Sequence, residues 1–252
     1  MKKVAFLFCI YLLSAAPLHA EDALREFFTK GNIAYKESAY DSALNYYLQI
    51  DSAGYTGWEL HYNAGNAYFK TGQIAHAVLH YEKALRLSHG NKDVLHNLKF
   101  AEQSTVDDIT RMPQLFYEKW WQNLLTLFTA TTWFVISAVF FIFTCAGVFV
   151  YFTNLNGLKL AGYYLTAAGA IFCLFTILIT YSAHSRLTAQ NEGVIMTSTV
   201  KVKSEPSATG KTLFVIHSGL KVLVRTEEEG MAEIQLPDGR VGWIENKELA
   251  RI

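Results

Sequence analysis

Residues 65–85 read GNAYFKTGQIAHAVLHYEKAL, and residues 31–50 read GNIAYKESAYDSALNYYLQI. The two stretches align without a gap at a fixed spacing of 34 residues, and each has two segments of helical periodicity joined by a short turn. The matched pairs are Gly31 and Gly65, Asn32 and Asn66, Tyr35 and Phe69, Ala43 and Ala77, and Tyr47 and Tyr81. The chain therefore contains an internal repeat whose unit is a pair of helices.

A period of 34 residues is typical of the tetratricopeptide repeat, in which each unit is a pair of antiparallel helices. The two units run over 24–57 and 58–91. Each unit leaves an apolar face that only a neighbouring element can cover. We expect a capping helix, or a degenerate third repeat, at 92–104, where apolar residues recur at helical spacing, and hence an α-helical repeat domain over 21–104.

The first helices of such arrays line a concave face that binds protein partners. At this face the sequence offers amides that can hydrogen-bond an extended peptide, aromatic rings and two lysines. Tyr35 and Phe69 can equally be core residues, and that alternative stays open. Phe28 and Tyr62 stand where carboxylate-binding arrays carry a cation, so a terminal-carboxylate clamp is not predicted. The expected partner-binding residues are Phe28, Asn32, Tyr35, Lys36, Tyr62, Asn66, Phe69 and Lys70.

Residues 1–20 read MKKVAFLFCIYLLSAAPLHA, with two lysines, a short apolar run and then small residues. That order is typical of a secretory signal peptide, and the apolar run is too short to span a bilayer comfortably. We expect cleavage after Ala20, and retention as an anchor is the open alternative. The residues that follow would then lie outside the cytoplasm.

Two further stretches, 132–153 and 160–182, contain no charged residue. Each has about the ~20 residues that an α-helix needs to cross a ~30 Å hydrocarbon core. Because only the turn 154–159 separates them, a transmembrane hairpin is favoured over two buried helices of a soluble core. The fold class is therefore a multidomain membrane protein, with a linker at 105–131 before the first span.

The hairpin fixes the topology, because two spans return the chain to the side from which it entered. Gly162, Thr166 and Ala170 recur every four residues and allow close helix contact, although ordinary small-residue content gives the same pattern. The distribution of Lys and Arg opposes the orientation mildly, since the turn carries only Lys159. Following the signal peptide, we expect two spans in the cytoplasmic (inner) membrane and both soluble domains on the periplasmic side.

Residues 190–252 change to short, alternating, β-branched runs separated by Gly, Pro and Asp turn signals, which favours a small all-β barrel. The segments VKVKSEPSATGKTLFVIHSGLKVLV and LPDGRVGWIENKELARI resemble a bacterial SH3 domain. The resemblance implies a module that docks on proteins or binds cell-wall peptides. Met231 stands where many such domains carry tryptophan. We expect Trp243 to pack onto the barrel core, with ligand contact as the alternative.

The remaining residue types indicate no chemistry. Lys plus Arg equals Asp plus Glu, so net charge gives no indication of nucleic-acid binding. Cys9, Cys145 and Cys173 lie in the signal peptide and the spans, which leaves no disulfide for the exported parts. His76 and His80 are four residues apart but have no third ligand nearby, so we expect a solvated helix face. We predict no enzyme, no cofactor and no metal site.

The order of signal peptide, two tetratricopeptide units, linker, membrane hairpin and SH3-like domain resembles the BatE family of the Bacteroides aerotolerance operon. The resemblance covers essentially the whole chain and includes the linker sequence HNLKFAEQSTVDDITRMP with the tryptophans that follow it. It implies a non-enzymatic envelope protein that acts beside membrane proteins carrying von Willebrand A domains and beside a MoxR-type ATPase.

These features together predict a membrane-anchored envelope adaptor that binds other membrane or envelope proteins through its repeats and its SH3-like domain. Tethering both modules to the bilayer would raise their local concentration towards a shared partner. The alternative is a cell-wall protein whose SH3-like domain binds peptidoglycan.

Overall fold

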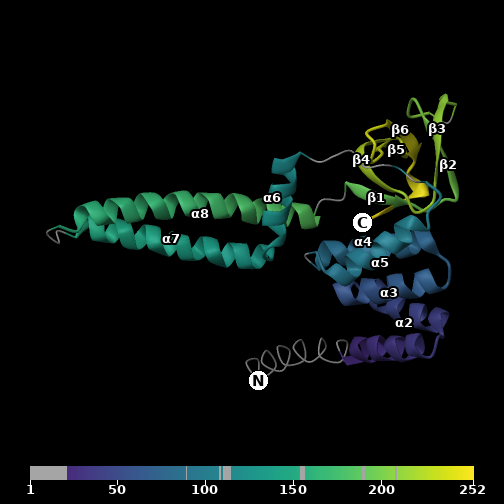
Figure 1. Ribbon diagram of the computed structural model, residues 1–252, viewed down its shortest axis with the longest axis horizontal. Helices are drawn as coiled ribbons and strands as arrows, with labels where there is room; N and C mark the ends of the chain where they lie inside the picture. Colours follow the sequence, from purple (N-terminus) through teal and green to yellow (C-terminus); the bar gives the residue numbers. More distant parts are fainter. Residues whose placement is uncertain are drawn as a thin grey trace, which may run out of the picture. The chain divides into compact units, whose positions relative to one another are not determined.

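The computed structural model describes residues 22–88, 90–107, 109, 115–153, 157–188, 191–207 and 209–252. They form two compact units (Figure 1). The first unit combines the N-terminal helices with the C-terminal strands, and the second contains the helices between them. The predicted signal peptide at 1–20 and part of the turn predicted at 154–159 lie outside the described residues.

The predicted helical repeat array is confirmed. Successive helices pack against one another as antiparallel pairs, and a fifth helix covers the second pair. The first helix is described over residues 22–36; the others are α2 (Tyr40–Ser52), α3 (Trp58–Lys70), α4 (Ile74–Leu87) and α5 (Lys92–Gln103).

In both units a tyrosine ring packs closely on a glycine at the equivalent position. A Cβ atom added to Gly65 would lie 2.7 Å from the ring of Tyr81, and one added to Gly31 would lie 2.5 Å from the ring of Tyr47. Both tyrosines are buried, so neither ring can move aside without opening the core. The same helix pair is thus built twice from the same contact.

The turn between the two helices of a unit also repeats. Gly72 takes the left-handed conformation at φ 77°, and Ser38, at the equivalent position of the first unit, takes it at φ 62°. Glycine adopts this conformation freely, whereas a side chain with a Cβ is strained in it. The departure from glycine in the first unit therefore costs stability without changing the fold.

The C-terminal strands form a seven-stranded antiparallel sheet in the order β3-β2-β6-β5-β4-β1-β7. Alternate side chains of β2, β4, β5 and β6 point into one apolar core, as period-2 sequences require. We call this sheet, with its turns, the β domain (residues 191–252). Its strands are β1 (Glu192–Ile195), β2 (Thr199–Lys203), β3 (Thr212–His217), β4 (Lys221–Glu228), β5 (Met231–Gln235), β6 (Val241–Glu245) and β7 (Leu249–Arg251).

Trp243 does not join the core of the β domain. Its neighbours on β6, Gly242 and Ile244, are buried, whereas Trp243 is half-buried on the opposite face of the strand. There it stands between its register partners Lys203 on β2 and Glu233 on β5. The expectation that this ring packs onto the core is wrong, because the alternation of β6 assigns the inward positions to its two neighbours.

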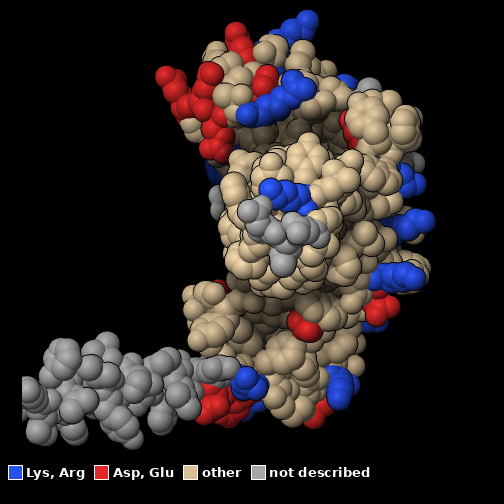
Figure 2. All heavy atoms as spheres, turned by 90° about the vertical axis from the view of Figure 1, so that its left-hand side faces the viewer, with Lys and Arg blue, Asp and Glu red and all other residues tan. Residues whose placement is uncertain are grey.

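The second unit consists of α6 (Phe116–Thr126), α7 (Ala130–Phe152) and α8 (Lys159–Thr188). Helices α7 and α8 are both long and apolar enough to cross a membrane. Their outward-facing side chains are mostly apolar. In Figure 2 the loop end of the hairpin faces the viewer, and the described atoms there are mostly tan, with one blue patch. Helix α8 continues beyond the expected span of 160–182 to residue 188, and α6 lies within the expected linker of 105–131.

Helices α7 and α8 meet along glycines that bring their backbones into contact. A Cβ at Gly147 would lie 2.6 Å from the backbone nitrogen of Thr166, and one at Gly162 would lie 2.7 Å from that of Tyr151. A Cβ at Gly169 would lie 2.7 Å from the side chain of Thr144 on α7. The contact stripe therefore includes two of the predicted residues, and its third member is Gly169.

Candidate protein-binding surface

Asparagine and tyrosine side chains tie each unit of the array to the next. Asn32 Oδ1 accepts a hydrogen bond of 2.8 Å from the hydroxyl of Tyr47 and one of 2.9 Å from the amide of Asn63. Asn66 Oδ1 accepts the equivalent bonds, 2.7 Å from Tyr81 and 2.8 Å from Asn97. The pattern repeats with the period of the sequence. The bonds from the tyrosines join the two helices of one unit, and the bonds between asparagines join the first helix to α3 and α3 to α5.

Burial keeps these tyrosines in the form that donates. It raises the pKa of Tyr47 to about 12 and raises that of Tyr81 as well, with nearby tyrosines adding to the effect. Both hydroxyls therefore stay protonated at physiological pH and can donate to the asparagines. The Oδ1 atoms of Asn32 and Asn66 are thus committed to the array, and the bonds above leave their Nδ2 groups for other partners.

The eight predicted partner-binding residues divide into two kinds. Lys36 and Lys70 are exposed. The other six are half-buried, and the four aromatic residues among them pack against the core of the array. Tyr35 and Phe69 are therefore neither fully core nor free surface. Each ring packs against the core with one part and is accessible to solvent with the other.

Two histidines face each other inside the second unit of the array. Nδ1 of His61 on α3 lies 3.2 Å from Nδ1 of His80 on α4, and both residues are buried. Desolvation lowers the pKa of His80 to about 3 and also lowers that of His61. Both rings are therefore neutral, with one Nδ1–H donating to the other nitrogen. The expectation of a solvated face is wrong for His80, because α4 turns it towards α3.

The repeat explains this pair, although the sequence analysis missed it. His61 and His80 align with Phe27 and Tyr46 of the first unit, whose rings also pack against each other. The position requires two rings in contact, and histidine supplies them in the second unit. Among the described residues, no group of three or more His, Cys, Asp or Glu is placed to hold a metal ion.

The β domain is joined to the array through α4. The ammonium group of Lys221 on β4 lies 2.9 Å from the carboxylate of Glu82 on α4 and 3.0 Å from that of Glu192 on β1. Burial alone would lower the pKa of Lys221, but attraction to the two carboxylates outweighs it and raises the pKa. Glu82 is buried on α4, and Lys221 of the β domain compensates its charge.

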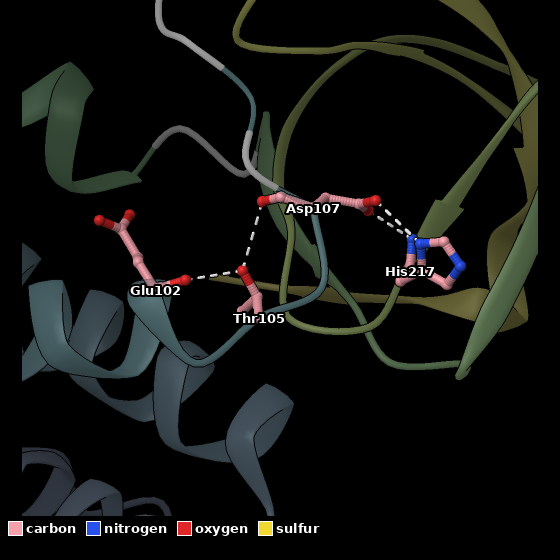
Figure 3. Close-up of polar contacts among 4 residues, drawn as sticks. All are labelled: Glu102, Thr105, Asp107 and His217. Carbon is pink, nitrogen blue, oxygen red and sulfur yellow. Dashed lines mark hydrogen bonds and ion pairs between the residues drawn. The ribbon is translucent and has the colours of Figure 1, made fainter.

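A second polar contact holds the segment that follows α5 (Figure 3). Asp107 accepts two hydrogen bonds from His217 at the end of β3, 2.6 Å from the backbone nitrogen and 2.8 Å from Nδ1. Thr105 turns this segment by donating to the carbonyl oxygen of Glu102 at 2.7 Å. The chain leaving the array is thereby fixed to the sheet before it continues to the second unit.

The array and the β domain also share apolar core. Val194 of β1 and Ile252 belong to the same buried cluster as the repeat helices, and Arg86 of α4 donates to the carbonyl oxygen of Ile252. A Cβ at Gly219 would lie 2.6 Å from the side chain of Thr105. We call the contacts of Glu82, Arg86, Thr105 and Asp107 with the β domain the junction. None of its polar contacts uses the eight predicted partner-binding residues.

Comparison with known proteins identifies the class of the helical part. Residues 58–91 match the tetratricopeptide repeat family, and these are the bounds that the 34-residue period predicted for the second unit. Tetratricopeptide repeats are typically non-catalytic scaffolds for protein–protein interaction. A comparison with curated proteins gives no match. The chain thus contains a tetratricopeptide repeat within a helical array, together with a β-sheet domain and two apolar helices.

Proposed function

We propose that this protein is a membrane-anchored envelope adaptor that binds protein partners at the face formed by the first helix and α3. The observation that carries the proposal is the repeated surface of half-buried aromatic rings, asparagine amides and the exposed lysines Lys36 and Lys70. Such a surface offers apolar contact and hydrogen bonds to an extended peptide, while the lysines favour acidic side chains beside it.

The membrane anchor is supported by α7 and α8. At about 1.5 Å per residue, helices of 23 and 27 residues are long enough for a ~30 Å hydrocarbon core. Most of their residues are unburied and apolar, such as Ile142 and Phe149. A helix of a soluble core would instead bury such side chains against protein. Lipid is the environment that satisfies them.

The sequence supports a proposal for the location and the biological setting. With a functional signal peptide at 1–20, the array would lie on the periplasmic side of the inner membrane, and the hairpin would return the β domain to the same side. The resemblance to the BatE family points to von Willebrand A-domain membrane proteins as partners, in a Bat complex that serves aerotolerance. The SH3-like sequence of the β domain supports a second docking site in that complex.

Site-directed photo-crosslinking in intact cells tests the adaptor role. A photoreactive phenylalanine at Lys70 of the full chain should crosslink to an integral membrane protein, and the same probe at Gln49, exposed on α2, should not. A second experiment places the probe at Tyr35, so that both lysines can be substituted. The double variant Lys36→Glu with Lys70→Glu should then lose the crosslink. Equal crosslinking from Lys70 and Gln49 would contradict a binding face at these helices.

A specific observation favours the alternative of peptidoglycan binding. Trp243 is partly exposed on the outer face of the sheet, where an indole ring can stack on a sugar or a peptide. Binding of the full, detergent-solubilised chain to purified sacculi tests it, with Trp243→Ala as the variant. Retention that depends on Trp243 would favour the cell-wall role. The full chain is required, because the β domain shares its core with the array.

A further inference from the structure

Helix α6 has apolar side chains along one half of its circumference, and only some of them are buried. Its apolar residues recur three and four apart on one side, and the polar residues Glu118, Lys119, Gln122 and Asn123 occupy the other side. Such a helix has to place about 180° of apolar surface against something. The apolar residues are Phe116, Tyr117, Trp120, Trp121, Leu124 and Leu125.

The second unit covers only one part of this apolar half. Leu125 is buried, and Trp121 and Leu124 pack against the cluster formed by Trp133 of α7 and by Ile179 and Ala183 of α8. Helix α6 therefore lies beside α8 within the unit (Figure 1). The adjacent aromatic residues remain uncovered: Phe116 is 86% exposed, Trp120 59% and Tyr117 54%.

The short connection to α7 restricts where α6 can lie. Only residues 127–129 separate Thr126, the last residue of α6, from Ala130, the first residue of α7. Three residues span at most about 10 Å, which is comparable with the headgroup layer between the ~30 Å hydrocarbon core and the ~40–45 Å full bilayer. Contact with α8 keeps the helix at that level.

We propose that α6 is an interfacial helix that lies flat at the headgroup level of the leaflet where α7 begins, with Phe116, Tyr117 and Trp120 inserted among the lipids. This inference rests on the proposed membrane anchor. Tryptophan, tyrosine and phenylalanine are the side chains that favour this layer. Since Glu118 and Lys119 compensate each other, the contact does not require anionic lipid.

Fluorescence quenching in vesicles tests the proposal. The full chain is reconstituted into phosphatidylcholine that is brominated near the headgroup, with the other tryptophans replaced by phenylalanine. Trp120 alone should lose fluorescence strongly, Trp121 alone should lose less because it faces the protein, and Trp58 alone, in the array, should lose none. Addition of anionic lipid should not change this order.

A further variant separates this proposal from the membrane anchor itself. Phe141→Trp in a background without other tryptophans places a probe on the exposed face of α7. Suppose that lipid brominated deep in its acyl chains quenches the single tryptophan of this variant, while lipid brominated near the headgroup does not quench Trp120 in the variant that retains it alone. That result would overturn the interfacial helix and leave the anchor standing. Absence of quenching at both positions would overturn the anchor, and with it the inference.

A second measurement covers the case in which these variants do not fold. Spin labels at Tyr117→Cys and Asn123→Cys, with Cys9, Cys145 and Cys173 replaced by alanine, report contact with lipid on the two faces of α6. Greater oxygen accessibility and lower accessibility to a water-soluble relaxation agent at residue 117 support the proposal. Equal values at the two positions, or a residue 117 shielded from both agents by a protein partner, would overturn it.

Discussion

Lys221 on β4 lies 2.9 Å from Glu82 on α4, and this ion pair connects the β domain to the repeat array. The carboxylate of Glu82 is buried, and the ammonium group of Lys221 compensates its charge. An ion pair in this position does little for net stability as a pair, but the loss of one partner leaves a poorly solvated charge. We therefore expect replacement of one partner to destabilise the junction more than replacement of both.

Glu82→Gln should lower the free energy of unfolding of the full chain in detergent by about 1–3 kcal/mol, because Lys221 loses its closest counter-charge. Urea denaturation followed by tryptophan fluorescence measures it. The double variant Glu82→Met with Lys221→Met should recover most of the loss. Lys247→Gln, which breaks the exposed pair with Glu245, should leave stability unchanged. Equal destabilisation by Glu82→Gln and Lys247→Gln would contradict the assigned role.

Acid should destabilise the array through the pair of His61 and His80. Both pKa values are lowered in the folded protein, that of His80 to about 3, so protons bind preferentially to the unfolded chain. The stabilising contribution is complete above about pH 6.5 and declines towards pH 3, by roughly 1.4 kcal/mol per pH unit and histidine. Urea denaturation at a series of pH values measures this slope.

Charged neighbours of the histidine pair modify the slope without reversing it. Asp51 opposes the lowering of the His61 pKa, whereas Lys83 adds to the lowering for both rings, and His76 adds to it for His80. His80→Phe should flatten the dependence on pH, and His96→Gln, at an exposed position, should retain it. Stability that is equal at pH 7 and pH 5 would be inconsistent with a buried neutral pair.

Ser38→Gly should stabilise the first unit. Ser38 holds the left-handed conformation that Gly72 holds in the second unit, and glycine relieves the strain of the side chain there. We expect a gain of about 0.5–1 kcal/mol, measured as a higher Tm. Ser42→Gly, in the first turn of α2, should instead lower the Tm, because glycine has the lower helix propensity. Shifts of the same sign for both variants would refute this interpretation.

Asn66→Ala should weaken the connection between α3, α4 and α5. The substitution leaves the hydroxyl of Tyr81 without this acceptor and leaves the amide of Asn97 with its bond to the hydroxyl of Tyr62, which together costs about 1–3 kcal/mol. Hydrogen exchange should show lower protection in α4 and α5. Asn45→Ala removes an exposed side chain of α2 and should change stability by less than about 0.5 kcal/mol. A neutral Asn66→Ala would show that the repeated bonds do not hold the array together.

The sequence predicted those features that arise from local repetition. The 34-residue period predicted both helix pairs, and the structure shows why Gly65 and Tyr81 recur in both units: the same close contact is made twice. The two apolar helices were evident from length and composition. The half-buried state of Tyr35 and Phe69 was not, because a ring at the edge of a core satisfies both the core and the surface interpretation of its sequence position.

The junction could not be predicted, since it depends on contacts between residues far apart in the chain. Asp107 and His217, or Arg86 and Ile252, have no sequence pattern that links them. The sequence predicted the β domain as a separate module, whereas in the structure it shares a buried core with the array. The burial of Glu82 gives no local signal either, because an isolated glutamate on a helix normally faces solvent.

The shared core dictates an order of events during synthesis. Val194 and Ile252 complete a cluster that the repeat helices begin, and residues 112–189 are made between these two contributions. Nascent helices of the array must wait, with part of their apolar surface uncovered, until the sheet has been translated. Chaperones that protect partly folded domains would find their substrate here, and a chain released before residue 194 would have an array whose buried cluster lacks Val194 and Ile252.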